Sequence, residues 1–273
     1  MPEELTARAR AVVDRDPSWV VPAPRDSATV VLLRDVADGF EVFVLRRVSS
    51  MAFAAGMHVF PGGVVEPGDV EVPWHPGADP DPTRLSASPG VARALVAAAV
   101  RETFEECGAL LATDGAGRAP GADEAARVGV LDGSIDFGSL LRERGLAVDG
   151  QALQPWDHWV TPEVEPRRYD TRFFVAALPP GEHAVDVGGE ADRVRWVRPE
   201  LAVSECVAGR MPMLPPTFAV LESLRPFASS AQVLAAAPAR VLRPLMPHPF
   251  DDGAGGIRWA MVDVRDGSEV GPV

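Results

Sequence analysis

The segment FPGGVVEPGD, residues 60–69, is followed 31 residues later by the segment RETFEECG, residues 101–108. The first segment is rich in glycine and proline and follows an apolar run that begins at Met57. Because Gly62 and Gly63 carry no side chain, the backbone there can turn tightly and approach another group closely. The first segment therefore predicts a tight turn beside a ligand.

The second segment ends a predicted helix that spans residues 89–107. Ser88 suits the N-cap, and Pro89 suits the first helical position. Residues 91–107 contain neither glycine nor proline, and Gly108 suits the left-handed position that often follows a helix. These signals define both ends of the helix.

Three glutamates lie together at the end of this helix. Glu102, Glu105 and Glu106 are spaced i, i+3 and i+4, so their carboxylates share one face. The charges repel one another, they oppose the helix macrodipole, and Arg101 offsets only part of the repulsion. A solvated acidic helix end is one interpretation. The other is a site for a hard divalent cation such as Mg²⁺, which binds several anionic oxygens in a small volume.

The two segments together resemble the Nudix box, whose usual form is G-x5-E-x7-R-E-U-x-E-E-x-G-U, where U is aliphatic. All charged residues of the second half match, as does its glycine. There are three departures: Asp69 replaces a glutamate, Thr103 occupies an aliphatic position, and 31 residues in place of seven separate Asp69 from Arg101. A long insert at this point is similar to that of the Nudix branch that cleaves coenzyme A and its acyl esters.

The resemblance implies roles for these residues. The expected metal ligands, for Mg²⁺ or Mn²⁺, are Glu102, Glu105, Glu106 and the Gly63 carbonyl. Glu106 is expected to make most of the metal contacts, while Gly62 and Gly63 contact the substrate through their backbone. Arg101 is expected to orient Glu105 or another carboxylate through a charge-assisted hydrogen bond. Asp69 or Glu66 is expected to brace the turn.

The general base stays open between Glu190 and Glu105. In Nudix proteins a glutamate in a loop before a strand often completes the metal site or acts as the base. Glu190 precedes the strand-like residues 192–197 and occupies the matching place. Three other carboxylates are rivals for this role: Glu163, Glu165 and Asp192.

Four arginines are candidates for binding a substrate phosphate. Arg46 and Arg47 end a predicted strand, residues 41–47, which leads toward the substrate cleft in the Nudix fold. Arg168 and Arg172 are four residues apart at the entry of another strand, so their side chains share a face if that strand is regular. The alternative for each arginine is an ion pair with a surface carboxylate.

Two residues of reactive types are expected to be structural. His58 lies between Met57 and Val59 in a short predicted strand, where a packed histidine is commoner than a general base. Cys107 has no obvious partner histidine and is expected to be a packed thiol. Cys206 is the other cysteine, and two cysteines do not make a disulfide framework.

The fold class expected from the resemblance is α/β: a Nudix-type α/β/α sandwich with a mixed central sheet. We expect one domain over residues 1–273, with a core at 28–200, an irregular proline-rich insert at 70–88 and a helical C-terminal extension at 199–240. Helices are predicted at residues 3–13, 89–107, 136–145, 199–208, 217–224 and 229–237. Strands are predicted at residues 28–33, 41–47, 109–112, 167–176, 192–197 and 257–264.

The composition limits the classes of partner. The chain has 273 residues and a net charge of −13, which argues against nucleic-acid binding because that requires a basic surface. The N-terminus has no basic and apolar leader, and no apolar run reaches the length of a membrane span. We therefore expect a cytoplasmic protein without membrane contacts. Family habit suggests a homodimer.

The expected activity is metal-dependent hydrolysis of a nucleoside diphosphate linked to another group. Coenzyme A or acyl-CoA is the leading substrate, cleaved to 3′,5′-ADP and phosphopantetheine or its acyl form. The alternatives are ADP-ribose, NADH or a nucleoside triphosphate. An alternative of another class is a non-catalytic nucleotide sensor, against which the intact charged residues argue.

Overall fold

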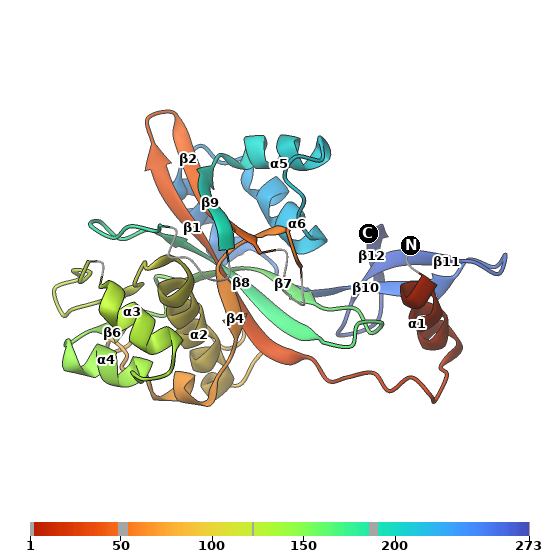
Figure 1. Cartoon of the computed structure of the whole chain (residues 1–273), viewed down its shortest axis with the longest axis horizontal. Helices are drawn as coiled ribbons and strands as arrows, with labels where there is room; N and C mark the ends of the chain where they lie inside the picture. Colours follow the sequence, from red (N-terminus) through yellow and green to blue (C-terminus); the bar gives the residue numbers. More distant parts are fainter. Residues whose placement is uncertain (1–2, 49–53, 122, 186–190, 273) are drawn as a thin grey trace.

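The computed structural model describes residues 3–48, 54–121, 123–185 and 191–272. A mixed sheet of ten strands runs through these residues in the order β12-β11-β10-β7-β8-β1-β2-β3, with β4 paired to β1 and β9 paired to β2 (Figure 1). Its strands are β1 (Arg25–Val36), β2 (Gly39–Arg47), β3 (His58–Val59), β4 (Gly62–Val64), β7 (Gln154–Val160), β8 (Tyr169–Ala177), β9 (Ala191–Val197), β10 (Pro244–Asp251), β11 (Ile257–Asp263) and β12 (Glu269–Pro272). A separate small ladder joins β5 (Ala112–Thr113) to β6 (Ala147–Val148).

The central strand β1 explains why helices cover both faces of the sheet. It pairs in parallel with β8 and antiparallel with β2 and β4. Its side chains alternate between faces: Val30 and Leu32 belong to one hydrophobic cluster, and Val31 and Leu33 belong to another. All four are fully buried, as expected for a strand that lies between two apolar layers.

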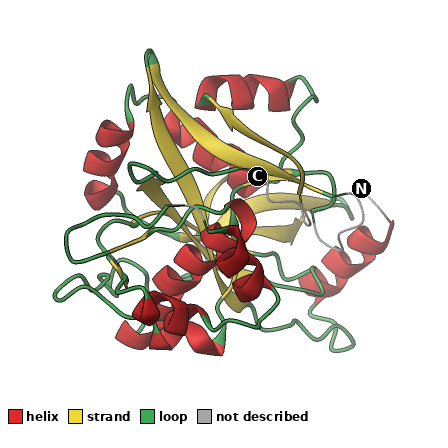
Figure 2. Ribbon diagram, turned by 60° about the vertical axis from the view of Figure 1, so that its left-hand side comes forward, coloured by secondary structure: helices red, strands yellow, loops and turns green. Residues whose placement is uncertain are grey.

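Helices form these two layers. One cluster contains α2 (Pro89–Cys107), α3 (Glu124–Leu131) and α4 (Phe137–Glu143), and the other contains α5 (Pro199–Val207), α6 (Pro215–Leu224) and α7 (Ser230–Ala236). Figure 2 shows helices on both sides of the strands. The predicted α/β/α arrangement with a mixed central sheet is confirmed. Five of these helices were predicted within three residues at each end; α3 was not foreseen. None of the described helices is long and apolar enough to cross a membrane.

Helix α2 has the ends that its sequence predicts. The Ser88 hydroxyl accepts a hydrogen bond from the Val91 amide, and Pro89 begins the helix. Gly108 adopts the left-handed conformation with a φ of 75°, and its amide donates to the Phe104 carbonyl at 2.9 Å. The helix is thus stopped directly after its glutamates.

The insert between the two segments is largely irregular, as expected, but it is firmly attached. It begins with a short 3₁₀ helix, η1 (Pro67–Glu71). Further along, Leu85 is fully buried in the cluster under α2. The Arg84 guanidinium donates to the Ala237 carbonyl at 2.7 Å, so the insert is linked to the end of α7.

The C-terminal residues extend the sheet further than predicted. Only β11 was foreseen, whereas β10 and β12 flank it. Strand β10 contains Pro244, Pro247 and Pro249, which argue against a strand because proline cannot donate to the ladder. Its recorded pairing to β7 covers only its first two residues, so most of β10 faces a single neighbour and tolerates proline there. Helix α1 (Glu3–Asp14) contacts this extension through Arg10, which pairs with Asp251 at 3.0 Å.

Candidate active site

The glycine turn and the acidic helix end meet in space. Strand β4 pairs with β1, which places the turn against α2. The Gly62 amide donates to Glu106 Oε2 at 2.9 Å. Gly63 lies so close to Glu102 that a Cβ atom added to it would be 2.2 Å from Glu102 Oε1. Two segments that are far apart in the sequence therefore form one site.

A buried ion pair fixes the turn to the helix. Arg101 donates to both carboxylate oxygens of Asp69, at 2.9 and 3.1 Å, and to the Val64 carbonyl at 2.9 Å. Asp69 Oδ2 also accepts a hydrogen bond from the Glu66 amide at 2.7 Å. Asp69 therefore braces the turn, as expected, although its side chain is one methylene shorter than the usual glutamate.

The same arginine orients two of the glutamates. Its Nη1 atom lies 3.0 Å from Glu102 Oε1 and 3.2 Å from Glu105 Oε1. Burial alone would lower the pKa of Arg101, but the hydrogen bond to Asp69 and the charges of Glu102, Asp69 and Glu105 raise the pKa above its ordinary value. Arg101 is therefore a permanent cation shared by three carboxylates.

One cation does not compensate the carboxylates fully. Burial raises the pKa of Glu102 to about 7; the Arg101 charge opposes this shift and the Glu105 charge adds to it. Burial likewise raises the pKa of Glu105, again against the effect of Arg101. A further positive charge between the turn and α2 would therefore stabilise the ionised forms of Glu102 and Glu105.

The donor atoms at this face fit a hard divalent cation. Mg²⁺ and Mn²⁺ bind oxygen ligands. The oxygens available here are those of the glutamate carboxylates and of the backbone at Gly63, which has no Cβ. Among the described residues, however, no group of three or more His, Cys, Asp or Glu side chains is assembled around one point. Glu102 and Glu105 turn toward Arg101, whereas Glu106 turns toward Gly62.

Two departures from expectation have physical explanations at α2. Thr103, in an aliphatic position, is fully buried, and its hydroxyl donates to the Ala99 carbonyl at 2.7 Å, so no polar group is left without a partner. Arg127, which sequence reasoning missed, donates to the Glu105 carbonyl at 2.8 Å from helix α3. It supports the last turn of α2, where carbonyls lack helical partners. The sequence around Arg127 contains no motif that predicts this contact, and helix α3 itself was not predicted.

Cys107 and His58 are packed residues, as predicted. Cys107 is fully buried and its thiol donates to the Thr103 carbonyl; burial raises the pKa of the thiol to about 12. A thiol of this kind is a poor nucleophile at neutral pH. His58 is buried next to the Pro212 carbonyl, with 3.2 Å between Nδ1 and the oxygen.

Of the arginine candidates, Arg46 lines a cavity, whereas Arg168 and Arg172 are buried and used within the protein. Arg168 donates to the carbonyls of Thr161 and Pro22. Arg172 pairs with Asp26 and Asp170. Arg168 and Arg172 therefore support β8 and its neighbours, and their binding of a substrate phosphate stays a prediction.

The remaining predicted residues are Arg47 and Glu190. Arg47 ends β2, and its amide donates to the Met57 carbonyl at 3.0 Å, which closes the loop that begins after it. Glu190 lies outside the described residues. Its rivals Glu163 and Glu165 lie between β7 and β8, where Glu163 is 3.5 Å from His248.

A mixed sheet between two helical layers, with a glycine turn against the glutamates of α2, defines a Nudix-type protein. A family model described as NUDT19 Nudix domain matches residues 79–224, more than half of the chain. The chain therefore belongs to the Nudix hydrolase family, in the NUDT19 group. A solved NUDIX hydrolase from Alicyclobacillus acidocaldarius superposes with a TM-score of 0.67 and 30% identity, covering 79% of this chain and 97% of that one.

Two curated relatives are similar in sequence. The protein named acyl-coenzyme A diphosphatase NUDT19 is 31% identical in Gallus gallus over 237 residues and 28% identical in Homo sapiens over 234 residues. The matches cover 70% and 71% of this chain, and they span 62% of the length of each relative.

Proposed function

We propose that the protein hydrolyses the diphosphate of coenzyme A or acyl-CoA to 3′,5′-ADP and phosphopantetheine or its acyl form. The observation that carries this proposal is the meeting of the glycine turn with Glu102 and Glu106 across the 31-residue spacer. Family membership supports the reaction type, and the printed names of the two curated relatives support the substrate.

The proposed cofactor is Mg²⁺ or Mn²⁺, held by Glu102, Glu105 and Glu106 with the Gly63 carbonyl. When bound, it would neutralise the diphosphate and lower the pKa of the attacking water. The chain's own part is positional. Arg101 holds Glu102 and Glu105 at fixed distances, and the backbone of Gly62 holds Glu106.

The proposed general base is Glu105, with Glu190 as the competing candidate. A base works best when its pKa approaches the working pH, and burial shifts the pKa of Glu105 in that direction. Arg46 is proposed to contact a substrate phosphate from the end of β2, because it lines a cavity there.

Turnover of a defined panel tests the substrate assignment. With Mg²⁺, we expect coenzyme A and acyl-CoA to give 3′,5′-ADP and the corresponding phosphopantetheine, identified by mass. A chelator should stop the reaction, and added Mg²⁺ or Mn²⁺ should restore it. Turnover of only ADP-ribose, NADH or a nucleoside triphosphate would overturn the substrate but keep the Nudix chemistry. Binding of nucleotide without any turnover would support the sensor alternative.

The two glycines are expected to respond differently to alanine. A Cβ at Gly62 would lie 2.3 Å from the Ala28 carbonyl oxygen and 2.7 Å from Thr29 Cα, so Gly62→Ala forces β4 away from β1 and lowers stability by about 1–3 kcal/mol. At Gly63 the three atoms nearest to an added Cβ all belong to the Glu102 carboxylate, the end of a side chain, and none belongs to the backbone. Gly63→Ala should therefore leave the free energy of unfolding nearly unchanged. It should lower kcat/KM about 10²-fold, because the Glu102 carboxylate, a proposed metal ligand, is displaced.

Thermal melts and steady-state kinetics separate these two effects. Gly90→Ala is the matched control, since nothing lies within 4 Å of an added Cβ there. Equal loss of stability in both turn variants would contradict the assignment of Gly63 to the reaction site.

A further inference from the structure

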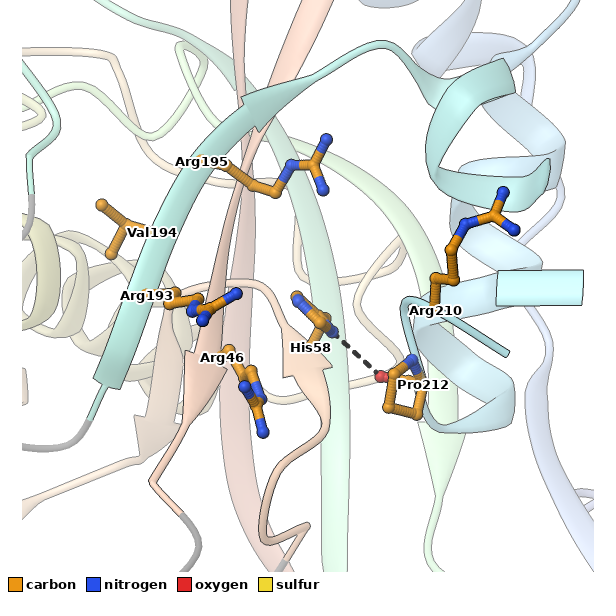
Figure 3. A pocket seen from close by; sticks show the side chains of 7 residues that line it. All are labelled: Arg46, His58, Arg193, Val194, Arg195, Arg210 and Pro212. Atoms are coloured by element: carbon orange, nitrogen blue, oxygen red, sulfur yellow. Dashed lines mark hydrogen bonds between the residues drawn. The ribbon is translucent and has the colours of Figure 1, made fainter. Parts of the chain in front are cut away.

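A basic cavity is lined by His58, four residues before Gly62 of the candidate active site. Its volume is about 590 Å³, within the range of small-ligand sites. The residues that line it are Arg46, His58, Arg193, Val194, Arg195, Arg210 and Pro212. Figure 3 shows four arginine side chains around the cavity, three from β2 and β9 and one from the loop after α5. We refer to it as the arginine pocket.

Strand pairing builds one wall of the arginine pocket. Arg46 of β2 is directly opposite Arg193 of β9 and His58 of β3. Arg195 is opposite Val44, whose side chain packs in the cluster with α5, α6 and α7. These cations therefore lie on the sheet face away from α2. Arg210 approaches from the loop between α5 and α6 (Figure 3).

The charge of the pocket is unusual for this protein. The chain has a net charge of −13, yet none of the described residues that line the pocket is acidic. Arg210 pairs with Glu205 at 2.6 Å, and Glu205 also feels the charge of Arg195. Arg193, Arg195 and Arg210 thus bring three guanidinium groups to a cavity whose described lining residues include no carboxylate. Guanidinium groups match the geometry of phosphate oxygens, which points to an anionic ligand.

The arginine pocket is close along the chain to the glycine turn, which contacts the glutamates. His58 and Gly62 are four residues apart, so their Cα atoms are at most about 13 Å apart in an extended chain. The His58 amide is fixed by the Pro212 carbonyl at 2.8 Å, and the Gly62 amide is fixed by Glu106 at 2.9 Å. One short segment therefore connects the pocket to the glycine turn.

We propose that the arginine pocket binds a phosphate monoester on the nucleoside part of the substrate, separate from the diphosphate that is cleaved. For coenzyme A this group is the 3′-phosphate. The proposal rests on the proposed function and adds its specificity determinant. A phosphate monoester carries a charge of about −1.5 to −2 at pH 7 and three acceptor oxygens, which suits several arginines better than a single one.

The test compares coenzyme A with dephospho-coenzyme A, which lacks the 3′-phosphate. We expect the wild-type protein to prefer coenzyme A at least about tenfold in kcat/KM. Each of Arg193→Ala, Arg195→Ala and Arg210→Ala should reduce this preference about tenfold. Arg258→Ala is the control for Arg210→Ala: each arginine is exposed and contacts one glutamate through two hydrogen bonds, but Arg258 lies on β11, far from the pocket. The control should leave the preference unchanged.

A binding measurement keeps the two proposals distinguishable. Calorimetry without added metal should show adenosine 3′,5′-bisphosphate binding at least about tenfold more tightly than adenosine 5′-monophosphate, with the difference lost in Arg195→Ala. Equal affinities, together with equal turnover of the two coenzyme A forms, would overturn the pocket assignment but not the hydrolase. Arginine-dependent binding of the bisphosphate without turnover of either form would overturn the hydrolase and keep the pocket.

Discussion

Glu106→Gln is expected to lower kcat for the proposed reaction by about 10³-fold, which corresponds to about 4 kcal/mol of transition-state stabilisation. The structure makes this substitution selective. The Gly62 amide donates to Glu106 Oε2, and a glutamine side-chain oxygen at the same position can still accept that hydrogen bond. The variant therefore loses a charge at the proposed metal site, whereas the contact that holds the turn is kept.

Steady-state kinetics with coenzyme A and a thermal melt check this expectation together. Glu222→Gln is the matched control: Glu222 is a partly exposed glutamate on α6 that pairs with Arg225, so its loss removes the same charge elsewhere. The control should keep its rate. Full activity of Glu106→Gln with an unchanged melting temperature would remove the Glu106 carboxylate from the reaction.

The parts of the fold that the sequence predicts well are specified locally. Helix α2 begins and ends where Ser88, Pro89 and Gly108 place it, because caps act within one turn. Asp69 or Glu66 was expected to brace the turn and Arg101 to orient a carboxylate, but the direct contact between Asp69 and Arg101 was not predicted. Arg101 binds both oxygens of Asp69 because η1 packs against α2.

Other features of the structure depend on properties that spacing does not encode. Arg168 and Arg172 are at a suitable distance in sequence for one binding surface, but their burial and carbonyl partners come from segments about 90 to 150 residues away. Strand β10 was missed because its prolines matter less once one edge lacks a long partner. A local sequence pattern does not predict which edge of a strand is paired.

The arginine pocket illustrates the same limit at the site. Arg46 was singled out at a strand end, while Arg193 and Arg195 were noted only as part of a strand. Their convergence requires β9 to pair antiparallel with β2, a contact between residues about 150 positions apart. Arg210 then depends on how the loop after α5 returns to the sheet (Figure 3). Such non-local pairing is visible only in the folded chain.

Arg101→Ala is expected to lower the free energy of unfolding by about 3–5 kcal/mol in metal-free protein, because it leaves buried carboxylates without their counter-ion. The Arg101 side chain is 7% exposed and contacts Asp69, Glu102 and Glu105 at 2.9, 3.0 and 3.2 Å. Denaturant unfolding in the presence of a chelator measures the loss. Arg34→Ala is the control: this strand arginine pairs with Glu41 near the surface, where an ion pair contributes at most about 1 kcal/mol.

The pH dependence of this loss distinguishes uncompensated charge from lost packing. Burial raises the pKa of Glu102 from its ordinary value of 4.5 to about 7. Between these two pH values the folded protein holds a proton on Glu102 that the unfolded chain has released. Its contribution to stability is therefore complete below pH 4.5 and is lost as the pH rises through 7. Without Arg101, which opposes that shift, the deficit should be larger at pH 8 than at pH 5. A deficit that is the same at both values would mean that the arginine acts through packing, and Asp69→Asn in a double-mutant cycle would then show additive losses.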